Sequence, residues 1–179
     1  QNKEEITVET LSGIKSLKVY KQNKEVNMLR VDMGKAELDP QNIPVAMKKE
    51  KIVNEPVNIG GKEYNITCVS MGNPHCVVFV NNVDGIDIEK EGPKFESDPL
   101  FPERVNTEFV KVINENTIKM RVWERGSGET WACGTGACAV AVAAVENGYC
   151  KKNEDITVKL KGGDLVIRYT DDTVFMTGA

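Results

Sequence analysis

The sequence predicts an α+β fold in which mostly antiparallel strands enclose one central helix. About ten segments alternate or cluster apolar residues between turn signals, as strands do. One segment, residues 137–147, is instead rich in alanine and apolar on nearly every side, so it should form a helix surrounded by other structure. A single helix among so many strands indicates a sheet that wraps around it.

The expected strands fall into an early group and a later, more complete one. In chain order they occupy residues 6–10, 14–20, 26–33, 64–71, 75–80, 105–113, 117–125, 155–160, 164–169 and 173–178. The proline-containing segment 34–59 should be a junction between the two groups. A second, weaker helical turn is predicted at 86–91, followed by a proline-punctuated loop at 92–104. The Gly162-Gly163 pair fits a hairpin turn better than a phosphate loop.

The alanine-rich helix should run from about Thr135 to Asn147, with Gly148 after its end and Thr130 or Thr135 helping to cap its start. Cys133 then lies at the helix entrance, in a glycine-rich turn. A thiol there meets free backbone N–H groups and the positive end of the helix dipole, which can hold a thiolate and a substrate carboxylate. Such a position can lower a cysteine pKa to about 3.5–7.5, so Cys133 is predicted to be reactive.

Composition excludes several classes of function. The formal net charge is −4 and the lysines are scattered among acids, which argues against a nucleic-acid partner and favours a small molecule. The longest apolar run is far short of the roughly 18 residues that cross a bilayer, so we expect a cytoplasmic protein without a membrane segment. The chain opens on Gln1 and enters a strand-like segment at once, which indicates part of a longer protein.

The five cysteines form an odd set without a CxxC pair, so reduced thiols are expected instead of a disulfide framework or a zinc site. Cys68, Cys138 and Cys150 fit small buried hydrophobes. Only Cys133 has an activating context, with Cys76 a distant second. No metal site is predicted.

Polar residues at three strand ends are further candidates. Asn73 and the only histidine, His75, occupy a turn between two strands, where the imidazole could partner a thiol or a substrate charge. Glu124 and Arg125 precede a glycine turn, and the arginine suits a carboxylate. Asn106 can offer donors and an acceptor to a polar ligand. Each of these residues, taken alone, also fits an ordinary turn or a solvated pair.

Several stretches together give a specific resemblance: VSMGNPHCVVFV, FPERVN, RVWERGSGETWACGTGACA, the GG hairpin and the final VFMTG. With them the chain resembles the diaminopimelate epimerase family, amino-acid isomerases of lysine and cell-wall biosynthesis that use no cofactor. The resemblance implies two similar halves, each a barrel-like sheet around a central helix. It assigns residues 1–33 to a remnant of the first half and 34–179 to the second half.

The resemblance also implies a mechanism. In the family two cysteines face each other across the cleft, one taking the α-proton and the other returning a proton to the opposite face. Cys133 is similar to one of them, and the other would precede Gln1. The expected substrate is a diamino dicarboxylic acid, with LL- and meso-diaminopimelate interconverted. This polypeptide should then be inactive without the missing N-terminal segment or a partner half, and a homodimer is a further expectation.

Single positions follow from the same resemblance. Substrate-binding residues are matched at Asn73, Asn106, Glu124, Arg125, Gly134 and Thr135, the last two in the carboxylate-binding turn. Groups that tune the thiols are matched at His75 and Glu124. Physical chemistry agrees with most of this, because a substrate with two amino-acid ends needs a second carboxylate anchor, which Arg125 can supply, and an acceptor for its ammonium group, which Glu124 can supply.

Alternative functions stay open. The nearest is another isomerase of the same broad fold, such as a proline racemase or a phenazine-biosynthesis-like enzyme. A one-headed amino acid would have no use for the distal pair Glu124 and Arg125. A cysteine hydrolase using Cys133 and His75 belongs to a different class. A non-catalytic fragment is the third alternative.

Overall fold

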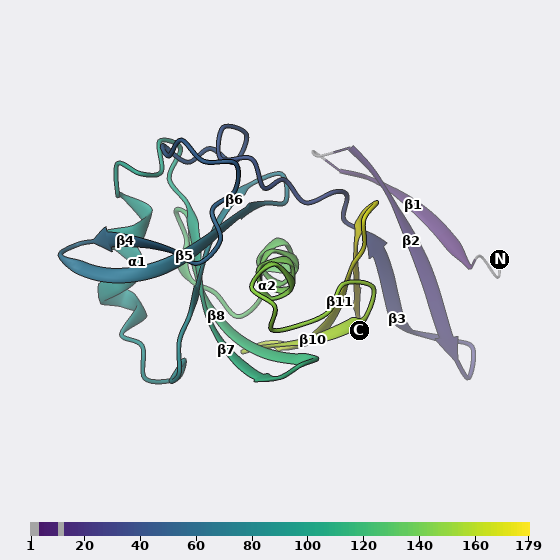
Figure 1. The fold of residues 1–179 in the computed structure, drawn as a ribbon. Helices are drawn as coiled ribbons and strands as arrows, with labels where there is room; N and C mark the ends of the chain where they lie inside the picture. Colours follow the sequence, from purple (N-terminus) through teal and green to yellow (C-terminus); the bar gives the residue numbers. More distant parts are fainter. Residues whose placement is uncertain (1–3, 11–12) are drawn as a thin grey trace.

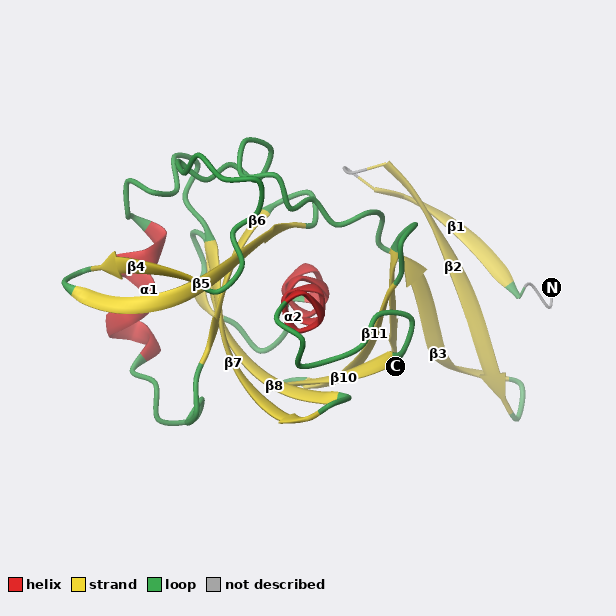
Figure 2. Ribbon diagram, in the orientation of Figure 1, coloured by secondary structure: helices red, strands yellow, loops and turns green. Residues whose placement is uncertain are grey.

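The computed structural model describes residues 4–10 and 13–179 (Figure 1). These residues form twelve strands and two helices (Figure 2). The strands are β1 (Glu5–Thr10), β2 (Gly13–Gln22), β3 (Glu25–Asp32), β4 (Glu55–Ile59), β5 (Lys62–Ser70), β6 (Pro74–Phe79), β7 (Asn106–Asn114), β8 (Thr117–Glu124), β9 (Gly128–Glu129), β10 (Asp155–Leu160), β11 (Gly163–Tyr169) and β12 (Val174–Gly178). The helices are α1 (Ile88–Glu96) and α2 (Gly134–Glu146). The predicted α+β class is confirmed.

The strands form one curved sheet around α2. Their order is β1-β2-β3-β12-β11-β10-β8-β7-β6-β5-β4, with β9 paired to β8 beside this path. All neighbours are antiparallel except β6 with β7 and β8 with β10. Figure 1 looks almost along α2 and shows the sheet curving past it on several sides. Since β1 and β4 end the order, the sheet encloses the helix without closing into a barrel.

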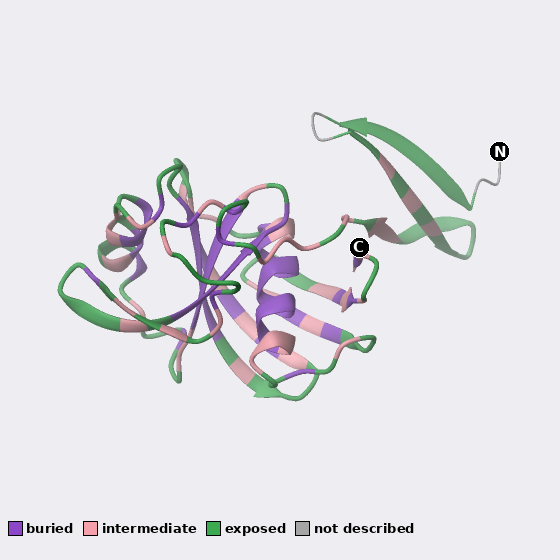
Figure 3. Ribbon diagram, turned by 45° about the horizontal axis from the view of Figure 1, so that its top comes forward, coloured by how far each residue is buried: buried purple, intermediate pink, exposed green. Residues whose placement is uncertain are grey.

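Helix α2 is buried because its side chains are small and apolar all round. Residues 136–144 are all buried, and Figure 3 shows the helix as the buried centre of the molecule. Alanine and valine let the strands approach the helix closely, so the sheet can curve tightly around it. Because it is packed on all sides, the helix holds the residues of its first turn in fixed positions.

Residues 66–70 of β5, 74–78 of β6 and 106–110 of β7 are buried on both faces of the sheet, since they separate two hydrophobic cores. Val77 and Val110 belong to the core around α2. Cys76 and Phe109 belong to a second core beneath α1. Alternate residues feed opposite cores, which explains why these strands read as nearly continuous apolar runs.

The loop predicted at 92–104 was wrong for its first five residues, because α1 continues to Glu96 with Pro93 inside it, whereas residues 97–104 are a loop as predicted. Tertiary contacts hold this helix: the Trp123 indole donates to the Glu96 carboxylate over 2.8 Å. Gly92 packs directly on the same indole, where a Cβ would lie 2.4 Å from Trp123 Cγ. Packing of this kind overrides the local preference against proline.

Two strands lie outside the predicted set. Strand β4 falls within the segment expected to be a junction, and it pairs antiparallel with β5. Strand β9 is a two-residue strand on the edge of β8. Strand β9 is too short to show an alternation, and the pattern of β4 is interrupted by Pro56, so each depends on the neighbour with which it pairs.

Strands β1 to β3 stand apart from α2 (Figures 1 and 3). They join the rest of the sheet where β3 pairs with β12, at positions such as Val31 opposite Met176. Apolar side chains on β1 remain exposed, with Ile6 at 36% and Val8 at 41%. The assignment of residues 1–33 to a separate half stays a prediction.

Candidate active site

Cys133 is the N-cap residue of α2. Its backbone is extended, with φ −141° and ψ 103°, and its sulfur accepts a hydrogen bond of 3.3 Å from the Gly136 N–H. The Thr135 hydroxyl lies 3.6 Å from the same sulfur. The residue is 8% exposed. The expected threonine cap is thus replaced by the cysteine itself, whose sulfur takes the place of the usual capping oxygen.

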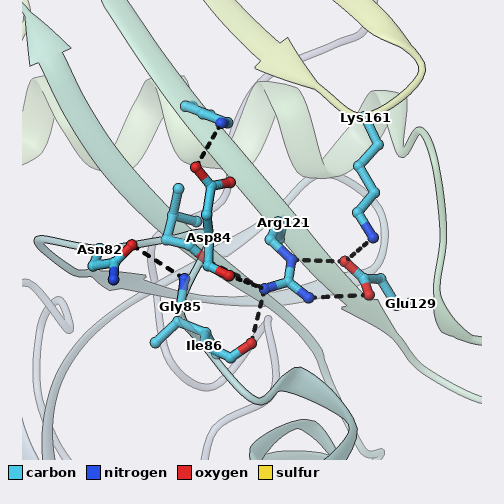
Figure 4. Close-up of polar contacts among 9 residues, drawn as sticks. Asn82, Asp84, Gly85, Ile86, Arg121, Glu129 and Lys161 are labelled. Carbon is cyan, nitrogen blue, oxygen red and sulfur yellow. Dashed lines mark hydrogen bonds and ion pairs between the residues drawn. The ribbon is translucent and has the colours of Figure 1, made fainter.

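The segment before Cys133 is clamped by charged groups (Figure 4). Glu129 on β9 accepts from Arg121 Nε over 2.8 Å and pairs with Lys161 Nζ over 2.8 Å. Arg121 also donates to backbone carbonyls of residues 83, 84 and 86. One guanidinium therefore ties β9 to β8 and to the loop that leads into α1.

The predicted hairpin turn at Gly162 and Gly163 is present, and it supports the same segment. The Gly162 N–H donates to the Trp131 carbonyl over 2.8 Å. Trp131 itself is 75% exposed, two residues before Cys133. The hairpin turn thus holds the backbone of the segment before Cys133 through this hydrogen bond, while the Trp131 indole is exposed to solvent.

Asn73 and His75 lie next to this turn, as the resemblance implies. The Asn73 amide nitrogen donates to Thr135 Oγ1 over 3.2 Å, and the Asn73 oxygen lies 2.9 Å from His75 Nε2. His75 is fully buried, so it is not a solvent-exposed residue of an ordinary turn. The structure brings the asparagine, the histidine and the start of α2 into one site.

The second side-chain partner of His75 is Glu108, which the sequence interpretation missed. Its Oε1 lies 2.6 Å from His75 Nδ1, and neither side chain is accessible to solvent. On β7 the inward positions are Asn106, Glu108 and Val110, all buried. A carboxylate within that buried alternation was the available signal, because an ionisable side chain at such a position needs a partner.

Asn106 and Arg125 form a second group of contacts. The Asn106 side chain donates to the Pro74 carbonyl over 3.0 Å and accepts from the Arg125 N–H over 2.8 Å. The Arg125 guanidinium donates to the Glu103 carbonyl over 2.9 Å. Asn106 therefore cross-links the turn that carries His75 to the end of β8, whereas the Arg125 side chain is exposed.

Glu124 lies at the end of β8, where the Thr130 hydroxyl donates to its carboxylate. This contact connects the end of β8 with the segment that leads to Cys133. Glu124 is half-buried, so part of it can still meet a ligand.

The surroundings of Cys133 favour the protonated thiol. Burial, and to a smaller extent the charge of Glu108, raise the pKa of Cys133 to about 12. Hydrogen bonds from Thr135 and from the Gly136 N–H lower the pKa but do not compensate. The expected lowering was therefore wrong, because burial and nearby carboxylates outweigh the helix terminus.

The other cysteines are all buried and free of disulfides. Burial raises the pKa of Cys138 to about 12 and that of Cys76 well above its usual range. Within the described ranges no cluster of His, Cys, Asp and Glu could hold a metal ion. Neither described helix is long and apolar enough to cross a membrane.

Comparison with known proteins decides the family. Residues 67–179, which carry every one of these site residues, match the family model of diaminopimelate epimerase. The chain belongs to the diaminopimelate epimerase family. It is 56% identical over 179 residues to the diaminopimelate epimerase of Acetivibrio thermocellus and 50% identical over 186 residues to that of Agathobacter rectalis. Each match covers 99% of this chain, but only 63% and 65% of those relatives, less than two thirds of their length.

Solved structures share the fold of this family member at low sequence identity. A hydroxyproline epimerase from Agrobacterium vitis aligns with a TM-score of 0.71 at 12% identity, covering 99% of this chain and 57% of that one. A phenazine biosynthesis protein of the PhzF family from Bacillus anthracis aligns with a TM-score of 0.64 at 15% identity, covering 100% and 66%. These likenesses support the epimerase-like architecture and say nothing of the substrate.

Proposed function

We propose that the protein containing this chain interconverts LL- and meso-diaminopimelate without a cofactor, in lysine and peptidoglycan precursor biosynthesis in the cytoplasm. The observation that carries this proposal is the Cys133 thiol at the N-terminus of the buried helix α2, next to a glycine turn and the Asn73–His75 pair. Family membership supports the substrate. Cys133 would be one of two thiols that exchange a proton with the α-carbon.

The first turn of α2 suits an amino-acid carboxylate. The N–H groups of Gly134 and Thr135 have no partner within the helix, as at any helix start. Donors fixed there would bind the carboxylate next to the reacting carbon. When the α-proton leaves, negative charge spreads onto that carboxylate, and preorganised donors stabilise it more strongly than they stabilise the ground state.

The distal end of the substrate would meet the second group of contacts. Arg125 is exposed, and among the described residues its guanidinium donates to the Glu103 carbonyl, which leaves further N–H groups to reach a second carboxylate. Glu124 would accept from the distal ammonium group, with Asn73 and Asn106 between the two ends. This division of roles would favour a two-headed substrate over proline.

Inversion needs proton carriers on both faces of the α-carbon. Cys133 supplies one, and the remaining cysteines lie in the cores. We therefore place the second thiol in a segment that precedes residue 1 in the longer relatives, or on a partner half. Without that thiol, this polypeptide would neither exchange the α-hydrogen nor invert the configuration of the α-carbon.

Proton NMR of LL-diaminopimelate in deuterated water tests the proposal. The chain alone should leave the α-proton signal unchanged, whereas a polypeptide extended upstream to the length of the relatives should replace it with deuterium and produce the meso isomer. Proline serves as the matched control and should not exchange. Isomerisation by the chain alone would contradict the proposal that the second thiol lies outside this chain. Exchange of proline in place of diaminopimelate would contradict the proposed substrate.

A further inference from the structure

Glu108 has no part in the proposed chemistry, yet it is connected to the thiol. Four contacts run from Glu108 to His75, from His75 to Asn73, from Asn73 to Thr135, and from Thr135 to the sulfur of Cys133. The second carboxylate oxygen of Glu108 is buried and has no hydrogen-bond partner. A buried carboxylate with one free oxygen is unfavourable unless the other oxygen makes a strong contact.

The chain of contacts has a direction. An amide nitrogen only donates and an amide oxygen only accepts, so Asn73 donates to Thr135 and accepts from His75. His75 therefore carries a hydrogen on Nε2. The 2.6 Å contact between Nδ1 and Glu108 needs a hydrogen as well, which the two groups share.

The direction reaches the sulfur through Thr135. Since the Thr135 oxygen accepts from Asn73, its own hydrogen is available to Cys133, 3.6 Å away. If His75 carried a hydrogen on Nδ1 alone, Asn73 would have to donate to Nε2 instead. Its oxygen would then take the Thr135 hydrogen, and the sulfur would lose that donor.

We propose that Glu108 is a positioning residue: by sharing a proton with His75, it keeps the Thr135 hydrogen directed at the Cys133 sulfur. The inference rests on the proposed role of Cys133 as a proton carrier. When the S–H bond breaks and the proton passes to the substrate α-carbon, the electron pair left on sulfur accepts the Thr135 hydrogen bond. Through the Thr135 hydrogen bond, and against the effect of its own charge, Glu108 would thus favour the thiolate without touching it or the substrate.

Two variants of similar size separate this role from a simple effect of charge. E108Q and E108M both remove the negative charge beside the thiol. Glutamine can still donate a hydrogen to Nδ1, with its oxygen at the unpartnered position, whereas methionine cannot donate. In the E108Q variant the Thr135 hydrogen should therefore still point at the Cys133 sulfur. In the E108M variant nothing fixes the hydrogen on His75 Nε2, so the Thr135 hydrogen is free to turn away from the sulfur.

The readout is the rate at which iodoacetamide alkylates Cys133, followed by mass spectrometry of its peptide between pH 7 and 10. The charged groups and thiols that act on the sulfur are Glu108, Glu124 and Cys138, and the last two are the same in both variants. We expect alkylation about tenfold slower in E108M than in E108Q, as for the loss of a hydrogen bond to a charged acceptor. The difference should disappear when Thr135 is replaced by valine. Equal rates in the two single variants, or a difference that survives in the T135V background, would overturn the proposal.

A second measurement needs no variant. His75 is the only histidine, so nitrogen-15 NMR of the intact chain gives a single set of imidazole signals, which needs no assignment. A hydrogen on Nε2 is expected, and an Nε2 without one would refute the inference. Both measurements are independent of turnover, so failure of the epimerase assay and failure of this inference are separate results.

Discussion

Gly136 leaves the space in which Glu108 approaches the thiol. A Cβ at Gly136 would lie 2.8 Å from Glu108 Oε1 and 3.0 Å from Cys133 Sγ. The first turn of α2, the buried carboxylate and the sulfur therefore meet at a point where no side chain fits.

Replacing Gly136 with alanine should destabilise the protein by about 1–3 kcal/mol, because overpacking outweighs the better helix propensity of alanine. Urea unfolding followed by circular dichroism measures the change. Gly134→Ala is the control: a Cβ there would meet only the flexible end of Met176, at 3.1 Å from its sulfur. An equal loss in the two variants would contradict the crowding at Gly136.

Glu129 should stabilise the segment before Cys133 at neutral pH. Hydrogen bonds from Arg121 lower the pKa of the Glu129 carboxyl, with further lowering from Lys161. A lowered pKa means that the stabilisation is present above the unfolded value near 4.5 and is lost as the pH falls through the folded value. Glu129→Gln should therefore lose about 1–3 kcal/mol at pH 7, and progressively less as the pH falls below the unfolded value.

The exposed pair of Lys159 and Asp164 provides the control for that experiment. Its side chains are 44% and 51% exposed, so Asp164→Asn should change the free energy of unfolding by less than about 1 kcal/mol. If Glu129→Gln behaved like this surface substitution at pH 7, the ion pairs shown in Figure 4 would not hold the segment.

The alkylation of Cys133 should rise steeply with pH in the alkaline range. Since the pKa of its thiol is raised to about 12, the thiolate is scarce at pH 7 and increases about tenfold with each pH unit up to that value. Peptide-resolved alkylation between pH 7 and 11 measures this. A plateau already reached at pH 8 would show that the helix terminus outweighs burial after all.

Arg125 should matter only for the distal carboxylate. In the longer, active polypeptide, Arg125→Leu should raise KM for diaminopimelate at least about tenfold, because a charge-assisted hydrogen bond is lost. Arg125→Lys should restore part of the loss, since a point charge replaces the fork. Steady-state kinetics test this, and an unchanged KM in Arg125→Leu would exclude Arg125 as the anchor.

Most of the fold could be read from the sequence because local and tertiary preferences agree. The alanine-rich helix and its neighbours have periodicity, propensity and turn residues that all indicate the same elements. The end of α1 could not be predicted, since the contacts of Gly92 and Glu96 with Trp123 hold the helix on both sides of Pro93. Strand β4 depends on pairing with β5, which lies beyond any local signal.

The candidate site was foreseen through its motifs, but its electrostatics were not. Two short turns carry Asn73 with His75 and Cys133 with Thr135, and only the family resemblance joined these turns in one site, where the structure brings them together. Burial of the thiol depends on how the sheet closes over α2, and the approach of Glu108 depends on a strand far away in sequence. Desolvation of this kind is a property of the assembled core, so the motif alone predicts the wrong direction for the shift of the thiol pKa.

The exposed indole of Trp131 gives the cysteine turn an optical reporter. The chain has two tryptophans, and the other, Trp123, is half-buried with its N–H bonded to Glu96. Emission from water-exposed indole therefore comes from the residue two positions before Cys133. If the segment or partner half that carries the second thiol covered the turn, this emission would shift to shorter wavelengths and the indole would be shielded from a soluble quencher. Assembly of the site could therefore be followed by fluorescence without any label.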